Sequence, residues 1–220
     1  VWLRLWRRKD HVIVCGLGRK GRFLLDDLLA NGHQVVVIEK QVNPVIADEY
    51  RRRGAVILEG DAANPELLEN ARINRAKYLI CLMGDDALNL QVAFLSAHLV
   101  NDNPRHRLTC HVQLSSQDLM EVVRASERSL GAGSNVSLDV FNVYDSSARR
   151  LLQDDPVLRD QSLSRRKSIL ICGLGGFGKS LIRQLAYAFY RSKSSGKLDI
   201  ILLDREADLR LEELRMDCPG

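Results

Sequence analysis

The chain has 220 residues, of which 45% are hydrophobic and 27% are charged, and its formal net charge is +4. This composition is typical of a globular protein long enough for one full hydrophobic core and part of another, and no apolar run approaches the ~20 residues of a membrane span. The basic clusters are short, scattered and without interleaved aromatic residues, so we interpret them as solvated faces and linkers and exclude a nucleic-acid partner.

Residues 1–9 mix tryptophan, leucine and arginine. This composition suits a membrane interface or a junction with a preceding pore helix, and an edge strand or a packed helix tail is the alternative. Because the chain starts at Val1 without a methionine and stops within a helical pattern, we expect it to be a fragment of a longer protein. The prediction for residues 1–9 is a juxtamembrane-like segment.

The apolar strand at 12–14 runs into a glycine-spaced turn made by Gly16, Gly18 and Gly21. In such a turn the first glycine permits a sharp bend and the second lets the backbone approach a pyrophosphate. The third allows the following helix to pack closely on the strand, with its N-terminus aimed at the anion. The turn therefore predicts a phosphate site.

A second strand, at 35–38, ends in Glu39, which lies 23 positions after Gly16 (39 − 16). A carboxylate at this place accepts hydrogen bonds from the ribose hydroxyls of an adenosine and repels a 2′-phosphate. NAD or an adenine nucleotide is therefore favoured over NADP, although the neighbouring Lys40 weakens that exclusion. The alternative is that Glu39 is a solvated residue at a strand end.

Strands and helices alternate through the rest of the first half, which predicts an α/β fold with a doubly wound parallel sheet, a Rossmann domain over residues 10–153. Four more strands follow the first two, at 55–58, 78–82, 108–112 and 136–143. Four helices are expected between the strands: one at about 44–53, one that begins at 65, one from about 86 to 99 and one at about 116–125. A Gly-rich turn is expected at 131–133.

Acidic residues also follow the third and fourth strands, at the sheet edge where Rossmann ligands bind. Asp61 is a candidate acceptor for an adenine amino group. We interpret the pair Asp85 and Asp86 as a cap of the next helix, because an aspartate directly before an apolar-periodic helix is the usual N-terminal signal. We nominate no metal site, since too few oxygen ligands can be assigned.

Cysteines and histidines give no catalytic or metal constellation. Four of the five cysteines lie in predicted strands and are expected to be reduced and buried, and Cys218 near the end is uncommitted; the four are Cys15, Cys81, Cys110 and Cys172. The histidines are dispersed, and no nucleophile or orienting carboxylate accompanies any of them. They are His11, His33, His98, His106 and His111.

A second glycine-spaced turn, with Gly173, Gly175 and Gly178, follows another apolar strand. Asp204 at the end of the next strand corresponds to Glu39, so we predict the start of a second Rossmann-like domain, incomplete, over 167–220 after a linker at 154–166. The same segment fits a P-loop, in which Lys179 would contact phosphates and Ser180 magnesium. We favour the duplicated Rossmann start.

One combination of motifs resembles a known family. It consists of Gly16-x-Gly18-Arg19-x-Gly21, Glu39, Gly60-Asp61-Ala62 and Gly84-Asp85-Asp86-x-x-Asn89. Over residues 10–125 the chain is similar to the domains that regulate potassium conductance, the RCK or Trk-type NAD-binding family. The resemblance implies a cytosolic ligand-gated module that assembles into dimers or rings and acts on a membrane pore.

Carried over by position, the resemblance implies that the glycines of the first turn hold the phosphates and that Arg19 adds a positive charge near them. Glu39 would hold the ribose, Asp61 and Ala62 would border the adenine, and Gly84 would let the ligand pass close to the fourth strand. Family members often carry hydroxyl residues where this chain has Ala63 and Met83, and their loss removes hydrogen bonds to the ligand.

The sequence as a whole predicts a regulatory module of a potassium channel or transporter that binds NAD(H) or ATP/ADP and couples the ligand to gating. Its expected partners are other copies of itself and a pore or transporter subunit, upstream in the same chain, at the inner face of the cell membrane. The alternatives are a fragment of an NAD-dependent oxidoreductase without its catalytic part, and a P-loop NTPase-like switch.

Overall fold

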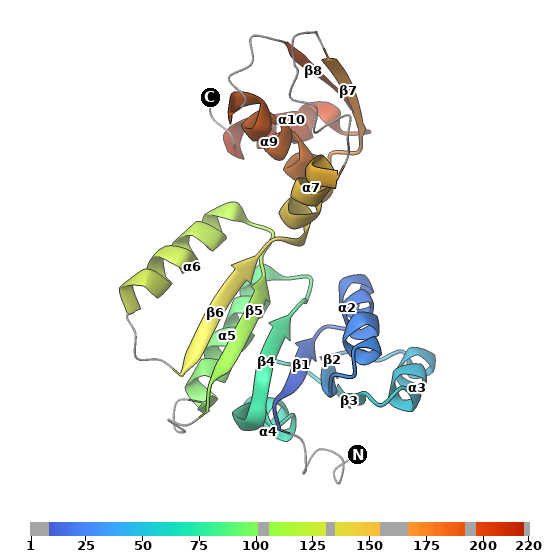
Figure 1. The fold of residues 1–220 in the computed structure, drawn as a ribbon, viewed down its shortest axis with the longest axis vertical. Coiled ribbons are helices and arrows are strands. Elements are labelled where there is room, and N and C mark those ends of the chain that lie inside the picture. The colour runs from blue at the N-terminus through green and yellow to red at the C-terminus, as the bar shows by residue number, and fades with distance from the viewer. Residues whose placement is uncertain (1–8, 101–105, 131–134, 155–166, 192–196, 218–220) are drawn as a thin grey trace. The chain divides into compact units, whose positions relative to one another are not determined.

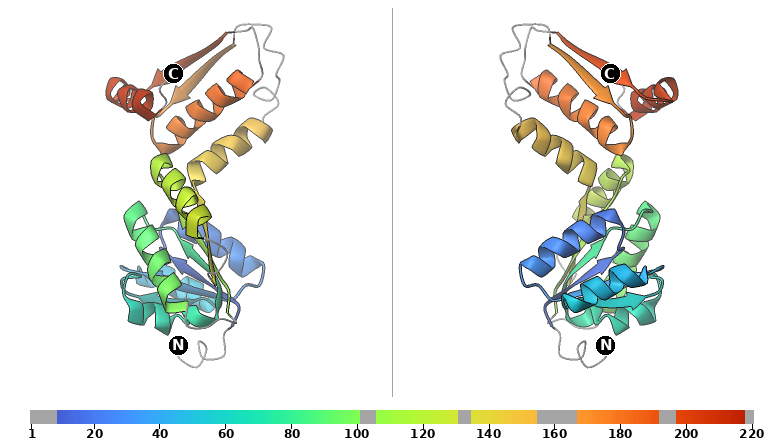
Figure 2. Two further views of the ribbon diagram at one scale, coloured as in Figure 1. Left: turned by 90° about the vertical axis from the view of Figure 1, so that its left-hand side faces the viewer. Right: turned by 90° about the vertical axis from the view of Figure 1, so that its right-hand side faces the viewer.

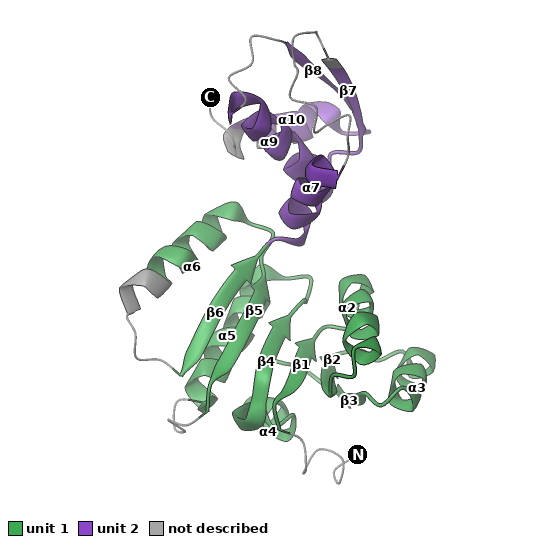
Figure 3. Cartoon of the chain, in the orientation of Figure 1, with its two compact units in different colours: residues 1–141 green, residues 142–220 purple. Residues whose placement is uncertain are grey.

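The computed structural model describes residues 9–100, 106–130, 135–154, 167–191 and 197–217 (Figure 1). Residues 1–8 of the expected juxtamembrane segment, the Gly-rich turn at 131–133, nearly all of the linker and Cys218 lie outside the described residues. The chain divides into two compact units, residues 1–141 and 142–220 (Figure 3). Each unit is described by itself.

The first unit is built on a six-stranded parallel sheet with the order β3-β2-β1-β4-β5-β6. Its strands are β1 (His11–Cys15), β2 (Val35–Glu39), β3 (Val56–Glu59), β4 (Ala76–Cys81), β5 (Leu108–Gln113) and β6 (Val136–Phe141). This order is that of a Rossmann fold, whose strand order reverses between β1 and β4. The predicted fold class is confirmed.

Helices cover both faces of this sheet, which explains why its central strands are apolar on both sides. The helices are α2 (Arg19–Ala30), α3 (Pro44–Arg52), α4 (Pro65–Asn70), α5 (Asp86–Val100) and α6 (Gln117–Leu130), with a short 3₁₀ turn η1 (Ile73–Arg75). Leu25 and Tyr50 of α2 and α3 pack into one core, and Leu68, Val92 and Met120 of α4, α5 and α6 pack into the other. Figure 2 shows α2 and α5 on opposite sides of the sheet.

Two helices begin at the Asn-Pro pairs that the sequence marks as starts. The Asn43 side chain accepts a hydrogen bond from the backbone N–H of Val45 at 3.0 Å, and the Asn64 side chain accepts one from Glu66 N–H, also at 3.0 Å. Proline follows each cap at the first helical position, where its missing N–H is no loss. Among the described residues, no helix has the length and hydrophobicity needed to cross a membrane.

The sixth strand ends earlier than predicted. It stops at Phe141, and α7 (Val143–Asp154) begins directly after it, so the expectation of a strand up to residue 143 is wrong. The reason is Asn142, whose side-chain oxygen accepts hydrogen bonds from the N–H groups of Tyr144 (2.9 Å) and Asp145 (3.3 Å). This is an N-cap, and it forces the turn into a helix.

The second unit contains α7, β7 (Lys167–Cys172), α9 (Gly176–Arg191), β8 (Leu198–Leu203) and α10 (Ala207–Asp217). The strands β7 and β8 pair in parallel. Helix α7 packs against α9, and the Asp145 carboxylate lies 3.5 Å from the Arg183 guanidinium. The compact units therefore divide between Phe141 and Asn142, before the domain boundary at residue 153 that we expected from the sequence.

One face of the β7–β8 pair is exposed, and this overturns one expectation. Cys172 was expected to be buried like the other strand cysteines, but its side chain is exposed. It shares a face with Leu170, Ile201 and Leu203, which are 59%, 55% and 61% exposed. On the opposite face Ile171 is buried, and a Cβ atom on Gly178 of α9 would lie 3.8 Å from its side chain.

Candidate functional site

The first glycine turn joins β1 to α2, and two of its glycines are required by the backbone. Gly16 has a φ of +104°, and a Cβ atom there would lie 3.2 Å from backbone atoms of Leu82 and Met83. A Cβ atom on Gly21 would lie only 2.0 Å from the Gly16 carbonyl oxygen. Non-glycine residues avoid such a φ, and real Cβ atoms do not approach so closely.

Gly18 is different, because nothing lies within 4 Å of the place where its Cβ atom would be. It stands at the N-cap position of α2, which has no side-chain cap and no acidic residue in its first turn. The first N–H groups of α2 therefore lack the side-chain acceptor that Asn43 and Asn64 supply to α3 and α4. An open helix N-terminus of this kind favours an anion such as phosphate, and the exposed Arg19 begins the helix beside it.

Glu39 lies against the same turn. One oxygen of its carboxylate accepts a hydrogen bond from Leu17 N–H at 2.5 Å, and the other accepts one from Gln41 N–H at 3.2 Å. The carboxylate at the end of β2 is therefore fixed next to the bend between Gly16 and Gly18. Each oxygen keeps a second lone pair that a hydroxyl group can use.

Lys40 and Asp61 form an ion pair at the same edge of the sheet. Lys40 Nζ lies 2.8 Å from Asp61 Oδ2, and Asp61 Oδ1 accepts a hydrogen bond from Ala63 N–H at 3.0 Å. The bond to Asp61 raises the pKa of Lys40, and the bonds from Lys40 and then Ala63 lower the pKa of Asp61. Ala62 is buried, and its side chain packs in the hydrophobic core of the first unit.

The Asp85–Asp86 pair divides into two roles. Asp85 Oδ1 accepts a hydrogen bond from Leu88 N–H at 2.8 Å and caps α5, as predicted. Asp86 instead accepts hydrogen bonds from the N–H groups of Ser115 (2.8 Å) and Ser116 (2.9 Å), which follow β5. Gly84 before them has open space at its Cβ position. Among the described residues, no cluster of side chains has the composition of a metal site.

A polar network beside the turn was missed by sequence reasoning. The fully buried Asn89 side chain donates to the carbonyl groups of Met83 and Gln113, each at 3.0 Å, and accepts from Met83 N–H at 3.0 Å. Lys20 of α2 donates to the Gln113 side chain. Burial lowers the pKa of Lys20. Asn89 stood in the quoted motif without a role, and Lys20 had no signal beyond its position after Arg19.

The second glycine turn repeats the geometry of the first. Gly173 has a φ of +99°, a Cβ atom on Gly178 would lie 2.0 Å from the Gly173 carbonyl oxygen, and Gly175 has open space. Asp204 accepts a hydrogen bond from Leu174 N–H at 2.6 Å, as Glu39 does from Leu17. The two turns therefore match at their three glycines and at the acidic residue that follows the next strand.

The P-loop alternative does not fit this turn. Helix α9 already begins at Gly176, so Lys179 and Ser180 lie inside it. Ser180 is fully buried, and its hydroxyl accepts a hydrogen bond from Arg183 at 3.2 Å. A hydroxyl held in the interior is not placed to bind a magnesium ion at the turn.

Three cysteines lie beneath the first turn in the core. Cys15, Cys81 and Cys110 are buried on the neighbouring strands β1, β4 and β5. A hydrogen bond with Cys15, followed by burial, raises the pKa of the Cys81 thiol, and burial raises that of Cys110 to about 12. Their predicted burial is confirmed, and such thiols are chemically inert.

Several known proteins are similar to this chain. Among proteins of known sequence, the TrkA homologue of the Trk potassium uptake system from Pyrococcus abyssi is 34% identical over 43% of this chain and 40% of its own length. Potassium channel protein 1 from Methanocaldococcus jannaschii is 28% identical over 46% of this chain and 30% of its own. The matched region thus spans less than half of either relative.

The fold is also that of a solved structure. The crystal structure of GsuK bound to ADP superposes with a TM-score of 0.59 at 19% identity, over 91% of this chain and 45% of that one. The model of the TrkA-N domain matches residues 12–132, which include the whole first glycine turn, Glu39, Asp61 and Gly84. By this match over more than half of its length, the chain belongs to the TrkA-N domain family.

Proposed function

We propose that the first unit is a regulatory module that binds an adenine nucleotide, NAD(H) or ATP/ADP, at its glycine turn. The observation that carries the proposal is the contact between Glu39 and Leu17 N–H at 2.5 Å. It brings a ribose-binding carboxylate to the side of a turn whose helix N-terminus is open to phosphate. These two features together match the ribose and the phosphate of a nucleotide.

In this proposal each part of the ligand meets its own group. The phosphates lie over Gly18 at the N-terminus of α2, with Arg19 adding positive charge. The ribose hydroxyls donate to the remaining lone pairs of Glu39. The adenine lies towards Lys40 and Asp61, whose side chains form an ion pair at 2.8 Å. Gly84 leaves room beside the fourth strand.

We further propose that ligand binding biases a potassium channel or transporter. The support is the family membership and the names of the relatives, a Trk potassium uptake protein and a potassium channel protein. GsuK, whose fold the chain shares, has been crystallised with ADP. A coupling of about 1 to 3 kcal/mol between ligand and pore would be typical of such regulation. The proposal places the module in the cytoplasm, as an oligomer at the inner face of the membrane, and assigns no catalytic residue.

Calorimetric titration with NAD, NADH, NADP, ATP, ADP and AMP tests the ligand. We expect at least one of the adenine ligands without a 2′-phosphate to bind, and Gly18→Asp to abolish that binding, because a carboxylate would occupy the phosphate position. Gly18 has the space for this side chain, so the fold should survive. Glu39→Ala should weaken binding by about tenfold to a hundredfold, the value of charge-assisted hydrogen bonds.

The matched control is Gly175→Asp at the equivalent place in the second turn, which should leave binding at the first turn unchanged. Circular dichroism of all variants checks that they fold. If none of the six nucleotides binds, or if the tightest-binding of the ligands without a 2′-phosphate binds Gly18→Asp as strongly as the native chain, the first turn is not the site and the proposal fails.

A further inference from the structure

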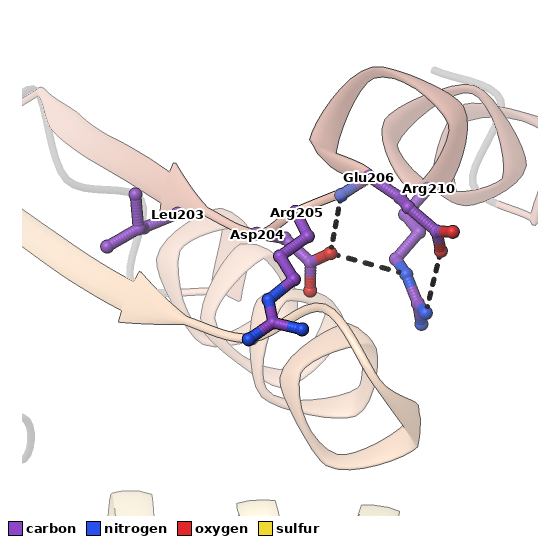
Figure 4. A pocket seen from close by; sticks show the side chains of 6 residues that line it. Leu203, Asp204, Arg205, Glu206 and Arg210 are labelled. Carbon is purple, nitrogen blue, oxygen red and sulfur yellow. Dashed lines mark hydrogen bonds and ion pairs between the residues drawn. The ribbon is translucent and has the colours of Figure 1, made fainter.

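An open pocket of about 620 Å³ lies beside the second glycine turn (Figure 4). It is lined by Gly173, Leu203, Asp204, Arg205, Glu206 and Arg210. Its position next to the acidic residue at the end of β8 corresponds to the ribose position next to Glu39 in the first turn. The chemistry of the two positions differs, and this difference points to a different ligand.

The Asp204 carboxylate already lies beside a guanidinium group of the second unit. Its Oδ1 lies 3.4 Å from Arg210 Nε and accepts a hydrogen bond from Glu206 N–H at 2.9 Å. The same Arg210 guanidinium lies 3.1 Å from a Glu206 carboxylate oxygen. Asp204 thus has a cation beside it, which it shares with Glu206, and its side chain is only 13% exposed.

Glu39 has no such partner. Among the residues that the structure describes, its carboxylate accepts only backbone hydrogen bonds, from Leu17 and Gln41. The nearest basic residue in sequence, Lys40, is paired with Asp61. The carboxylate at the first turn therefore keeps its negative charge towards a ligand, and it repels a phosphate on the ribose.

Arg205 follows Asp204 in the chain as Lys40 follows Glu39. Lys40 is held in an ion pair, whereas the Arg205 guanidinium can contact a ligand. Its side chain is exposed, and no ion pair or side-chain hydrogen bond holds it within the described ranges. Figure 4 joins Asp204, Glu206 and Arg210 by dashed lines and draws Arg205 without one. The pocket thus has two carboxylates and two guanidinium groups, with a formal net charge of zero (−2 + 2), and one guanidinium is uncommitted.

We propose that this pocket binds an adenine nucleotide that carries a phosphate on its ribose 2′ position, as NADP(H) does, and that Arg205 pairs with that phosphate. A planar guanidinium binds phosphate through two parallel hydrogen bonds, and an arginine beside the strand end accommodates the 2′-phosphate in Rossmann folds. The 5′-phosphates lie at the N-terminus of α9, which has no acidic residue in its first turn. This inference adds a second site and does not depend on the first being occupied.

The test uses the full chain with Gly18→Asp, which removes binding at the first turn. The probes are adenosine 2′,5′-bisphosphate, AMP and inorganic phosphate, measured by calorimetry. We expect the bisphosphate to bind at least tenfold more tightly than AMP, and inorganic phosphate to bind more weakly than either. Arg205→Met should weaken bisphosphate binding by about tenfold to a hundredfold and leave AMP almost unchanged, because a charge-assisted phosphate contact is lost.

Lys40→Met, the matched change at the first turn, is the control and should leave bisphosphate binding as it was. Equal affinity for the bisphosphate and AMP would overturn the inference, as would tight binding of inorganic phosphate alone, no binding at all, or an Arg205→Met chain that binds like its parent. The first site is tested separately, since NAD or ADP binding that Gly18→Asp abolishes is measured in the otherwise native chain.

Discussion

The two glycine turns of this protein have the same backbone and different surroundings. Gly16 and Gly173 have φ values of +104° and +99°. In each turn a Cβ atom on the third glycine would lie 2.0 Å from the carbonyl oxygen of the first. A Cβ atom on Gly16 would lie 3.2 Å from backbone of the β4–α5 connection, whereas a Cβ atom on Gly173 would have no contact within 4 Å among the described residues. The turn is a local product of its sequence, and the site is a product of what packs around it.

The surroundings also decide the charge. At the first turn a lysine is paired with an aspartate that follows the next strand, and within the described part of the chain no cation pairs with Glu39. At the second turn an arginine from the following helix pairs with both Asp204 and Glu206, and Arg205 has no anionic partner among the described residues. Two turns with one motif therefore lead us to propose two different ligands.

The largest difference expected between the units is in thiol reactivity. Cys15 and Cys172 both end the strand before a glycine turn, but the first is buried and the second exposed. The pKa of Cys110, about 12 instead of 9.0, leaves it about a thousandfold less ionised near pH 8 than an ordinary thiol. We expect iodoacetamide followed by peptide mass spectrometry to find Cys172 modified and Cys15, Cys81 and Cys110 unmodified.

Urea should abolish this contrast by exposing all the thiols. Rapid modification of the three core cysteines in native buffer would contradict the buried core of the first unit.

The similarity of the turns is tested by the third glycine. Gly21→Ala and Gly178→Ala each place a Cβ atom against a backbone carbonyl, so each should destabilise its own unit by about 3 kcal/mol or more. Gly18→Ala and Gly175→Ala are the controls, with open space, and should change stability by less than about 1 kcal/mol. Urea unfolding followed by circular dichroism measures all four. A well-tolerated Gly178→Ala would show that the second turn is looser than the first.

Two asparagine side chains with different roles should differ in their effect on stability: Asn89 makes buried hydrogen bonds, and Asn142 caps a helix. Asn89→Ala leaves two carbonyl groups and one N–H of the first unit without their partner and should destabilise the protein by about 2 to 4 kcal/mol. Asn142→Ala removes the N-cap of α7 and should destabilise it by about 1 kcal/mol. Urea midpoints of the two variants give the comparison, and the reverse order would mean that the network around Asn89 has little effect.

The smallest effect concerns the ion pair of Lys40 and Asp61. Both side chains are largely solvated, at 70% and 40% exposure, so Asp61→Asn should shift the urea midpoint only slightly at pH 7. The pKa of Asp61 is lowered in the folded protein. Its small contribution is therefore present above its ordinary pKa of 3.8 and is lost as the pH falls through the lower folded value. A large loss of stability in Asp61→Asn at pH 7 would contradict this.

The fold could be predicted in detail because its signals are local. Strand and helix alternate, Asn43-Pro44 and Asn64-Pro65 mark helix starts, and the strand order follows from the Rossmann pattern. The end of β6 could not be predicted in the same way, because an apolar run continues past Asn142 to Val143. Only the capping hydrogen bonds of the Asn142 side chain decide that the strand stops.

The site could be predicted only where it is carried by the chain's own spacing. The distance from Gly16 to Glu39 places the carboxylate beside the turn, as found. The contact of Lys20 and the bonds that Asp86 makes outside its own helix could not be predicted, because their partners come from β5 and its following loop. Likewise the exposure of Cys172 depends on how many helices pack on its sheet, which its apolar strand does not reveal.

The hydrogen bond from Leu17 N–H to Glu39 has a kinetic consequence. If the first turn binds a nucleotide as proposed, a carboxylate that holds the bend through the chain's own hydrogen bond makes a slow step of loop ordering unnecessary. We expect association to follow a single exponential whose rate rises linearly with ligand concentration, limited by collision and by the charge of Arg19. Under the proposed function, such a module would report the nucleotide concentration promptly, and the delay in its response would be set by how fast the ligand leaves.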